Sequence, residues 1–185
     1  MRVEDGKGRG FWASINAANQ LETHAVAEPH DRYVNRQNQR VWSLPFTAID
    51  PVGANDYFLY IKNTGTEILA VTDLRIESTV AGIIEVQHVS GTPVYTADTD
   101  ITPVNRYLGS SNVPVATAKT DTDTTGLTSQ GVIFYMNMPV VDTIHHLSTS
   151  SNIIIPPGQQ MALLWTAATG ILSGVVSLAH IGTDV

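Results

Sequence analysis

The 185-residue chain contains no cysteine, few charged residues and no surplus of basic ones. The absence of cysteine excludes a disulfide framework, thiolate metal sites and cysteine nucleophiles. Charged residues make up 15% of the chain, against roughly 25% in an average soluble domain, so other side chains cover much of its surface. The net charge of −7 disfavours a protein that coats nucleic acid, because such binding depends on neutralising phosphates with Lys and Arg. We therefore expect no nucleic-acid partner.

A convincing membrane segment is also missing. Residues 161–179 are uncharged and about long enough to span a bilayer as a helix. Thr, Ser and Gly interrupt the stretch, however, and no Lys or Arg flanks it. We interpret it as two buried strands joined by a turn at residues 167–170 and entered through the chain breaker Pro156-Pro157-Gly158. The N-terminus has no apolar segment behind its charges, so we expect neither a membrane partner nor a secretory signal.

The chain is instead rich in β-branched residues, since Thr, Val and Ile account for 55 of its 185 residues. These side chains suit a pleated surface and lose freedom in helices. Short apolar runs at roughly ten-residue spacing, separated by turn residues, predict an antiparallel sandwich or barrel of about eight strands. In residues 69–74, alternation predicts that Leu69, Val71 and Asp73 share one face of a strand. The candidate strands are residues 41–49, 57–62, 68–78, 82–89, 101–107, 113–119, 132–138, 152–155, 159–167 and 171–181.

Several connections between these strands can also be predicted. Asn63-Thr64-Gly65-Thr66 is typical of a β-hairpin turn, because Asn and Gly tolerate the positive φ of tight turns. The polar runs 96–100 and 119–126 are expected to be loops that leave the sandwich, and loops on a rigid scaffold often carry interactions.

Residues 1–40 differ from the rest of the chain. They carry a net charge of +1, whereas residues 41–185 carry −8. Glycines, an Asn/Gln/Arg-rich run and few consecutive apolar residues indicate a segment that cannot bury enough surface to order itself. We predict an N-terminal arm, residues 1–40, extended or ordered by a partner, before a β-sandwich domain of residues 41–185. The predicted partner-binding residues of the arm are Arg2, Lys7, Arg9, Phe11, Trp12, Arg32, Arg36 and Arg40.

Catalytic and metal-binding patterns are not found. No G-x-S-x-G turn is present to support a serine nucleophile, and the glycines at positions 6, 8 and 10 fit neither the dinucleotide nor the Walker spacing. A cupin metal site needs two His one residue apart on a strand, whereas His145 and His146 are adjacent and would point to opposite faces. We expect this pair in an exposed loop. The sequence predicts a protein that is not an enzyme and has no cofactor.

Two pairs of aspartates leave one question open. Asp98 with Asp100 and Asp121 with Asp123 could offer alternate oxygens to a cation such as Ca²⁺. The second pair matches the start of an EF-hand loop, but its twelfth position is Val132 where a bidentate Glu is required. An EF-hand is therefore excluded, and a weaker loop cation remains a hypothesis.

Four stretches of the chain resemble tailed-bacteriophage virion proteins. They are Asn19-Gln20-Leu21-Glu22-Thr23, then Tyr57 to Thr64 running into Ile68-Leu69-Ala70-Val71, then Thr102 to Arg106 with Ser110-Ser111-Asn112, and finally Ile155-Pro156-Pro157-Gly158-Gln159. The resemblance implies a short leader before a jelly-roll β-sandwich. It also implies a head decoration or cement protein on the capsid surface of a virion, with the major capsid protein as partner and a homo-oligomer, a trimer above all, as its assembly.

Two other functions are weighed against this one. A host-recognition or carbohydrate-binding module of a tail or head fibre would use Trp42, Tyr95, Tyr107 or Trp165 as stacking platforms. The competing prediction places Trp42 and Trp165 in the core of the sandwich, which would leave a sugar-binding function without its best platforms. A jelly-roll enzyme of the cupin type is disfavoured by the missing metal ligands.

Overall fold

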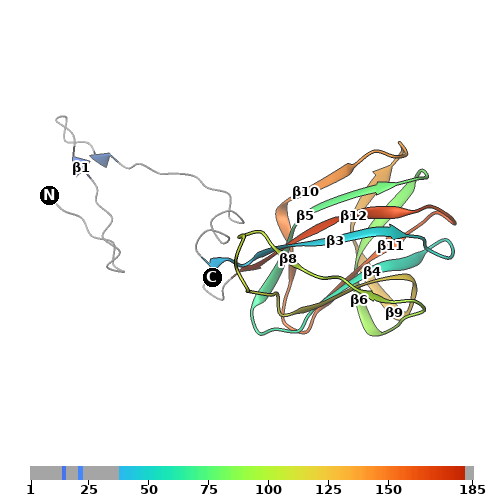
Figure 1. The fold of residues 1–185 in the computed structure, drawn as a ribbon, viewed down its shortest axis with the longest axis horizontal. Coiled ribbons are helices and arrows are strands. Elements are labelled where there is room, and N and C mark those ends of the chain that lie inside the picture. The colour runs from blue at the N-terminus through green and yellow to red at the C-terminus, as the bar shows by residue number, and fades with distance from the viewer. Residues whose placement is uncertain (1–13, 16–20, 23–37, 182–185) are drawn as a thin grey trace.

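The computed structural model describes residues 14–15, 21–22 and 38–181, and this part of the chain is almost entirely β (Figure 1). The described strands are β1 (Ser14–Ile15), β2 (Leu21–Glu22), β3 (Val41–Ile49), β4 (Asp56–Asn63), β5 (Ile68–Ser78), β6 (Gly82–Val94), β7 (Thr99–Asp100), β8 (Val104–Asn105), β9 (Ala116–Met138), β10 (His145–Ile155), β11 (Gln160–Trp165) and β12 (Leu172–Ile181). Strands β1 and β2 pair only with each other. The remaining strands form two antiparallel sheets.

The two sheets pack face to face as a sandwich. One has the strand order β10-β5-β12-β3-β8 and the other the order β4-β11-β6-β9-β7. Within them the eight long strands pair in a nested way: β3 with β12, β4 with β11, β5 with β10, and β6 with β9. The first strand thus pairs with the last and the innermost two with each other, which is the order of a rolled-up hairpin. This is a jelly roll, and the predicted all-β sandwich of about eight strands is confirmed.

The core lies between the two sheets. Its largest fully buried side chains are Trp42, Trp165 and Phe58, which confirms the prediction that both tryptophans are internal. Alternation along β5 is interrupted, because the register with β12 shifts between Val71 and Asp73. Thr72 is the extra residue, so Val71 and Leu74 both reach the core while Asp73 does not. The expectation that Leu69, Val71 and Asp73 share a face is wrong for Asp73.

The largest difference from the predicted elements is in strand β9. Residues 119–126 are not a loop that leaves the sandwich, because they lie within this 23-residue strand. Its first half pairs with β4 and its second half with β6. The polar side chains of this run predict exposure to solvent, but Thr120, Asp121 and Thr124 are buried. One strand thereby contributes to both edges of its sheet.

Other boundaries also differ from the prediction. The expected hairpin at residues 63–66 joins the two sheets instead, since β4 pairs with β11 and β9 and β5 pairs with β10 and β12. His145 and His146 belong to β10 and not to a loop. The expected strand 101–107 is reduced to β8.

The uncharged stretch 161–179 forms β11, a turn and β12, as interpreted from its Thr, Ser and Gly residues. In residues 38–181 no helix is long and apolar enough to cross a membrane. Most of the predicted N-terminal arm lies outside the described residues.

Candidate functional site

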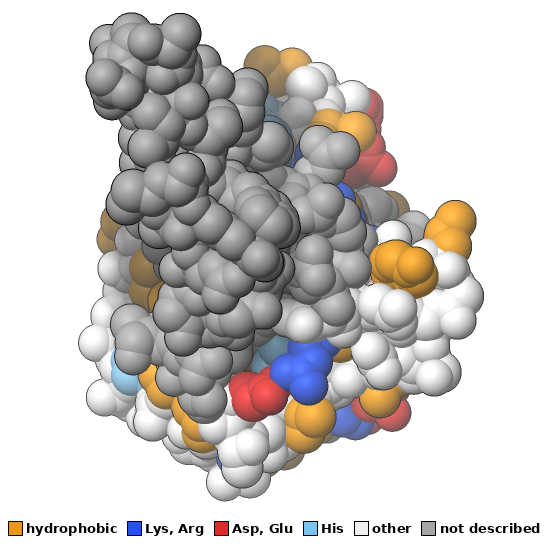
Figure 2. Space-filling view, turned by 90° about the vertical axis from the view of Figure 1, so that its left-hand side faces the viewer, with side chains coloured by type: hydrophobic (Ala, Val, Ile, Leu, Met, Phe, Trp, Pro, Cys, Tyr) orange, Lys and Arg blue, Asp and Glu red, His pale blue; other side chains and the backbone are white. Residues whose placement is uncertain are grey.

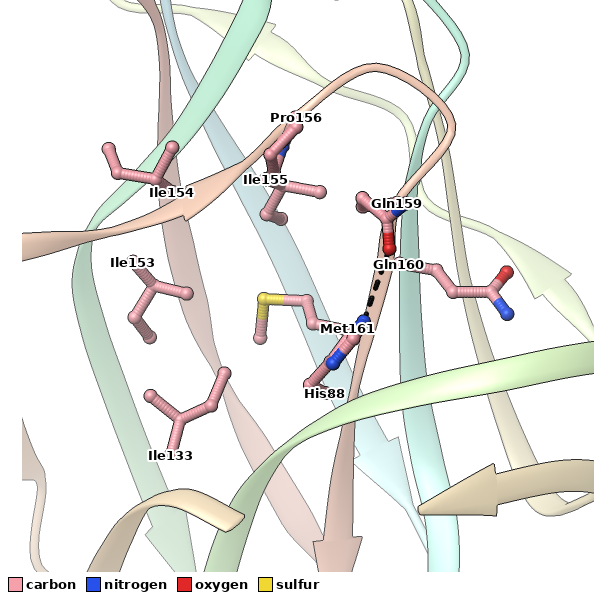
Figure 3. Close-up of a pocket in the computed structure, with 9 residues that line it drawn as sticks. All are labelled: His88, Ile133, Ile153, Ile154, Ile155, Pro156, Gln159, Gln160 and Met161. Carbon is pink, nitrogen blue, oxygen red and sulfur yellow. Dashed lines mark hydrogen bonds between the residues drawn. The ribbon is translucent and has the colours of Figure 1, made fainter. Parts of the chain in front are cut away.

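An apolar cleft lies where the two sheets come apart, between β10 of one sheet and β11, β6 and β9 of the other (Figure 3). Its volume is about 330 Å³. Met161 extends toward the middle of the cleft, with Ile153 and Ile155 on one side and Ile133 below them (Figure 3). The residues that line it are His88, Ile133, Ile153, Ile154, Ile155, Pro156, Gln159, Gln160 and Met161.

A bulge in β9 brings Ile133 to the mouth of this cleft. Val86 pairs with Phe134 and Gln87 with Val132, so Ile133 is an additional residue on the β9 side of the ladder. Bulges redirect side chains in this way. Ile133 remains 41% exposed although its neighbours Ile153, Ile155 and Met161 are buried. The cleft therefore has an aliphatic floor that is accessible from one side.

The rim of the cleft carries one polar pair. His88 Nε2 lies 3.2 Å from Gln159 Oε1, and Figure 3 shows this hydrogen bond beside the cleft. The amide of Gln160 points away and is bonded to the Tyr60 hydroxyl and the Gly91 carbonyl. No carboxylate or lysine lines the cleft. Such a surface suits the binding of an apolar group and lacks the paired acid and base of a catalytic site.

A second candidate surface is residues 104–115, which we call the 104–115 segment. It begins with β8 and runs to the start of β9. Five of its apolar side chains are exposed, and Leu108 is 89% exposed. Several exposed apolar side chains within twelve residues mark the segment as a candidate interaction site. These side chains belong to Val104, Tyr107, Leu108, Val113 and Val115.

Hydrogen bonds from the buried Trp42 and the half-buried Asn105 hold the 104–115 segment in place. Trp42 Nε1 donates a hydrogen bond of 2.8 Å to the carbonyl of Asn112. Asn105 Nδ2 donates to the carbonyl of Gln39 at 2.8 Å and to that of Asn112 at 3.1 Å. The segment is thus fixed next to residues 38–40, where the longest described part of the chain begins. Figure 2 shows one face of the molecule, on which white and orange side chains surround a few red and blue groups.

His180 provides a further anchor for the segment. The Val115 N–H donates to His180 Nε2 at 3.3 Å, so this nitrogen must be unprotonated. Trp42 meets the imidazole ring edge to face, with 5.3 Å between ring centroids. Burial lowers the pKa of His180 below 6.5; the Ile68 backbone and Glu67 act against this, and Arg40 adds to it. The neutral imidazole is therefore the form that fits the fold.

Acidification is expected to destabilise the protein through His180. Because the pKa of His180 is lowered in the folded state, the unfolded chain binds the proton at a higher pH than the folded chain. The contribution of the neutral imidazole to the free energy of unfolding is therefore fully present above pH 6.5 and decreases below it. Thermal melts between pH 8 and pH 5 should therefore show a steeper loss in the wild type than in His180→Gln, whose amide can still accept from Val115. His88→Gln, which changes an exposed histidine, is the control. Equal slopes for wild type and His180→Gln would contradict this role.

Of the arm residues predicted to bind a partner, the structure describes Arg40. Its guanidinium contacts both carboxylate oxygens of Glu67, at 2.6 and 2.8 Å. This hydrogen bonding holds the pKa of Glu67 below its ordinary value. Arg40 thus ties the start of β3 to the start of β5. The other predicted residues, Arg2, Lys7, Arg9, Phe11, Trp12, Arg32 and Arg36, lie outside the described residues.

Three of the four aspartates considered as cation ligands, Asp98, Asp100 and Asp121, already have partners for their carboxylates. Lys119 Nζ forms ion pairs with Asp98 and, at 3.1 Å, with Asp100. The ammonium of Lys119 also lies 5.0 Å from the centre of the Tyr95 ring. In the part of the chain that the structure describes, no three or more His, Asp or Glu residues are grouped so that they could hold a metal ion.

Asp121 is a buried member of the second pair. Its Oδ1 accepts from the N–H groups of Ala97 and Thr122, both at 2.8 Å, and its Oδ2 accepts from the Thr96 N–H at 2.9 Å. Burial by itself raises the pKa of Asp121, but these bonds, with one from the Thr124 hydroxyl, outweigh burial and hold the pKa below 3.8. This carboxylate fixes the chain after β6 against β9.

The aromatic platforms considered for carbohydrate binding are mostly enclosed. Trp42 and Trp165 are almost fully buried, and Trp165 Nε1 donates to the Thr169 carbonyl at 2.9 Å. Tyr95 is partly buried, and burial raises its pKa. Tyr107, in the 104–115 segment, is the exposed one among these four residues.

No protein-family model, curated protein or solved structure matches this chain. The sequence-based prediction named neither the cleft nor the 104–115 segment. The run Ile153-Ile154-Ile155 before Pro156 was the available signal for the cleft, because three consecutive isoleucines must place at least one side chain on each face of a strand.

Proposed function

We propose that this chain is a non-enzymatic structural subunit of a phage virion that attaches to the outside of the capsid as a decoration or cement protein. Its partner is the major capsid protein, and the subunits form a homo-oligomer, for which a trimer is the working model. The jelly roll supports this proposal only in part, because the same fold is also found in lectins and cupins. Further support for the proposal comes from the location of the exposed apolar side chains.

The observation that carries the proposal is the 104–115 segment. Its five apolar side chains are exposed, yet its backbone is fixed by Trp42, Asn105 and His180. A preordered apolar surface loses little conformational entropy when a partner covers it. The segment is hydrogen-bonded to the backbone of Asn38 and Gln39, so it lies beside the start of the longest described part of the chain. Both features favour a partner surface at this end of the sandwich.

The proposal predicts that Leu108→Asp weakens attachment to capsids. Burial of a leucine side chain contributes about 1.5–3 kcal/mol, so an affinity loss of roughly tenfold to a hundredfold is expected. Co-sedimentation of the purified protein with capsids assembled without it measures this loss. Ile144→Asp is the matched control, since Ile144 is also an exposed aliphatic residue but precedes β10 at the opposite end of the sandwich.

Ile144→Asp should bind as the wild type does. If Leu108→Asp also binds normally, or if both variants lose binding equally, the 104–115 segment is not the capsid-binding surface. A melting temperature close to that of the wild type excludes misfolding as the cause of a loss, because both side chains are exposed.

A further inference from the structure

The attachment of the 104–115 segment to the sandwich includes one titratable group, His180. The Val115 N–H donates to His180 Nε2 at 3.3 Å, and the Val115 carbonyl accepts from the Thr64 N–H at 3.1 Å. An imidazole nitrogen accepts a hydrogen bond only while it carries no proton, whereas both nitrogens of an imidazolium are donors. Protonation of His180 therefore sets two donors against each other at Val115 and removes this anchor.

The other nitrogen of the His180 ring faces groups that favour the charged form. Nδ1 is buried and makes no geometrically complete hydrogen bond in the described part of the chain. Its polar neighbours are the Ile68 backbone and Glu67 Oε2, which lies 3.9 Å away. A carboxylate at this distance attracts an imidazolium more than a neutral ring. Protonation thus weakens the contact of the ring with Val115 and strengthens its contact with Glu67.

Among the described residues, the charged groups that act on His180 are Glu67, directly before β5, and Arg40, directly before β3. Burial lowers the pKa of His180 and Arg40 adds to this effect, against Glu67 and the Ile68 backbone. The pKa of Glu67 is held below 4.5, and an arginine stays protonated. Both partners therefore keep their charges between pH 7.5 and pH 5.5, and His180 is the group of this cluster that can change charge there.

A pocket of about 300 Å³ lies under the end of the 104–115 segment. Val113 and Pro114 line it from the segment, while Leu44 and Leu178, both fully buried, line it from the sandwich. No residue of the segment belongs to the main core cluster. A segment with few buried apolar contacts opens at a lower free energy than the whole fold. The 104–115 segment can therefore leave the sandwich without disrupting the core.

We propose that protonation of His180 releases the 104–115 segment from a sandwich that stays folded. In the open segment His180 is free to titrate near its ordinary pKa of 6.5, so the open form gains population as the pH falls below this value. Opening uncovers the pocket and with it Leu44 and Leu178. The inference goes beyond the proposed attachment to capsids, because it concerns the protein on its own.

Hydrogen–deuterium exchange of the full-length protein, resolved by peptide, tests this proposal at pH 7.5 and pH 5.5. A histidine that has a pKa of 6.5 in the open form and stays neutral in the closed form shifts the opening equilibrium by about tenfold between these conditions. We expect this gain in peptides from residues 104–115, after correction for the intrinsic pH dependence of exchange. Peptides from residues 69–77 of β5 should not show it.

His180→Gln should abolish the gain, because its amide can accept from Val115 at either pH. His88→Gln is the matched control and should retain the gain, since His88 is exposed and bonds to Gln159. Equal gains in the wild type and His180→Gln overturn the proposal. An equal gain in residues 69–77 also overturns it, because the whole sandwich would then be unfolding.

The wild type alone decides the matter if His180→Gln does not fold. Absence of a gain in residues 104–115 relative to residues 69–77 then overturns the proposal, and its presence supports release of the segment. Neither result depends on whether Leu108→Asp binds capsids, so the two proposals fail independently.

Discussion

Trp42→Ala is expected to lower the free energy of unfolding by about 3–5 kcal/mol, the usual cost of truncating a buried tryptophan. The side chain is 1% exposed and belongs to the main core cluster. Its Nε1 also holds the Asn112 carbonyl, and its ring packs against His180. The substitution therefore opens a cavity and frees the 104–115 segment at once. Urea denaturation followed by circular dichroism measures the loss of stability.

Trp42→Phe separates the two roles of this residue. It keeps most of the apolar volume but loses the hydrogen bond to Asn112, so it should cost about 1 kcal/mol beyond any loss of packing. Proteolysis near Asn112 should increase in both variants, because both lack the Nε1 donor. A loss below 1 kcal/mol for Trp42→Ala would show that the residue is not part of the cooperative core.

Asp121→Asn is expected to cost roughly 3 kcal/mol, because it removes charge-assisted hydrogen bonds and turns an amide NH₂ toward backbone donors. Three N–H groups, of Thr96, Ala97 and Thr122, point at the carboxylate. An amide has one oxygen to offer and leaves at least one of these groups unpaired. Urea denaturation of the variant at pH 7 measures the difference.

The same carboxylate should govern part of the acid sensitivity of the protein. Its pKa is lowered in the folded state, so its contribution is present above the unfolded value near 3.9 and is lost as the pH falls through the folded value. Asp121→Asn should therefore lose less stability than the wild type between pH 5 and pH 2.

Asp123 supplies the control two residues further along β9. Burial raises its pKa, with repulsion from Asp56 and Asp121 adding to the effect, so Asp123→Asn removes an unfavourable charge. This variant should be as stable as the wild type or slightly more stable at pH 7. If Asp121→Asn is equally harmless, the hydrogen bonds to Asp121 contribute little to the fold.

The local sequence pattern predicted those strands well whose apolar side chains pack into the core. The bounds 41–49 and 68–78 were predicted as the structure has them, because turn residues flank apolar runs on both sides. The prediction failed at residues 119–126, where polarity suggested solvent. Asp121 is buried there because N–H groups of residues 96 and 97, more than twenty positions earlier, satisfy its carboxylate. A local sequence pattern cannot reveal a hydrogen-bond partner that lies so far away along the chain.

For the candidate surfaces, too, the sequence revealed a general property but not the residues involved. The small number of charged residues in positions 41–185 is visible in the sequence. It indicates surfaces that other subunits could cover, because charged residues are depleted at the core of protein interfaces. Which residues form them was not visible. Leu108 and Ile153 are both aliphatic, yet Leu108 is 89% exposed and Ile153 is buried beside the cleft. Only the packing of the two sheets distinguishes them.

The sequence by itself predicted a β-protein of about eight strands and favoured internal positions for Trp42 and Trp165. Composition and alternation are local properties, and they require only that one side of each strand be apolar. The tertiary structure decided the nested pairing, in which β3 joins β12 more than 120 residues later, and with it the jelly roll. It also decided the cleft, the anchoring of the 104–115 segment and the burial of Asp121. Each of these depends on a partner distant in sequence, and hydrophobic periodicity specifies a face without naming the partner that covers it.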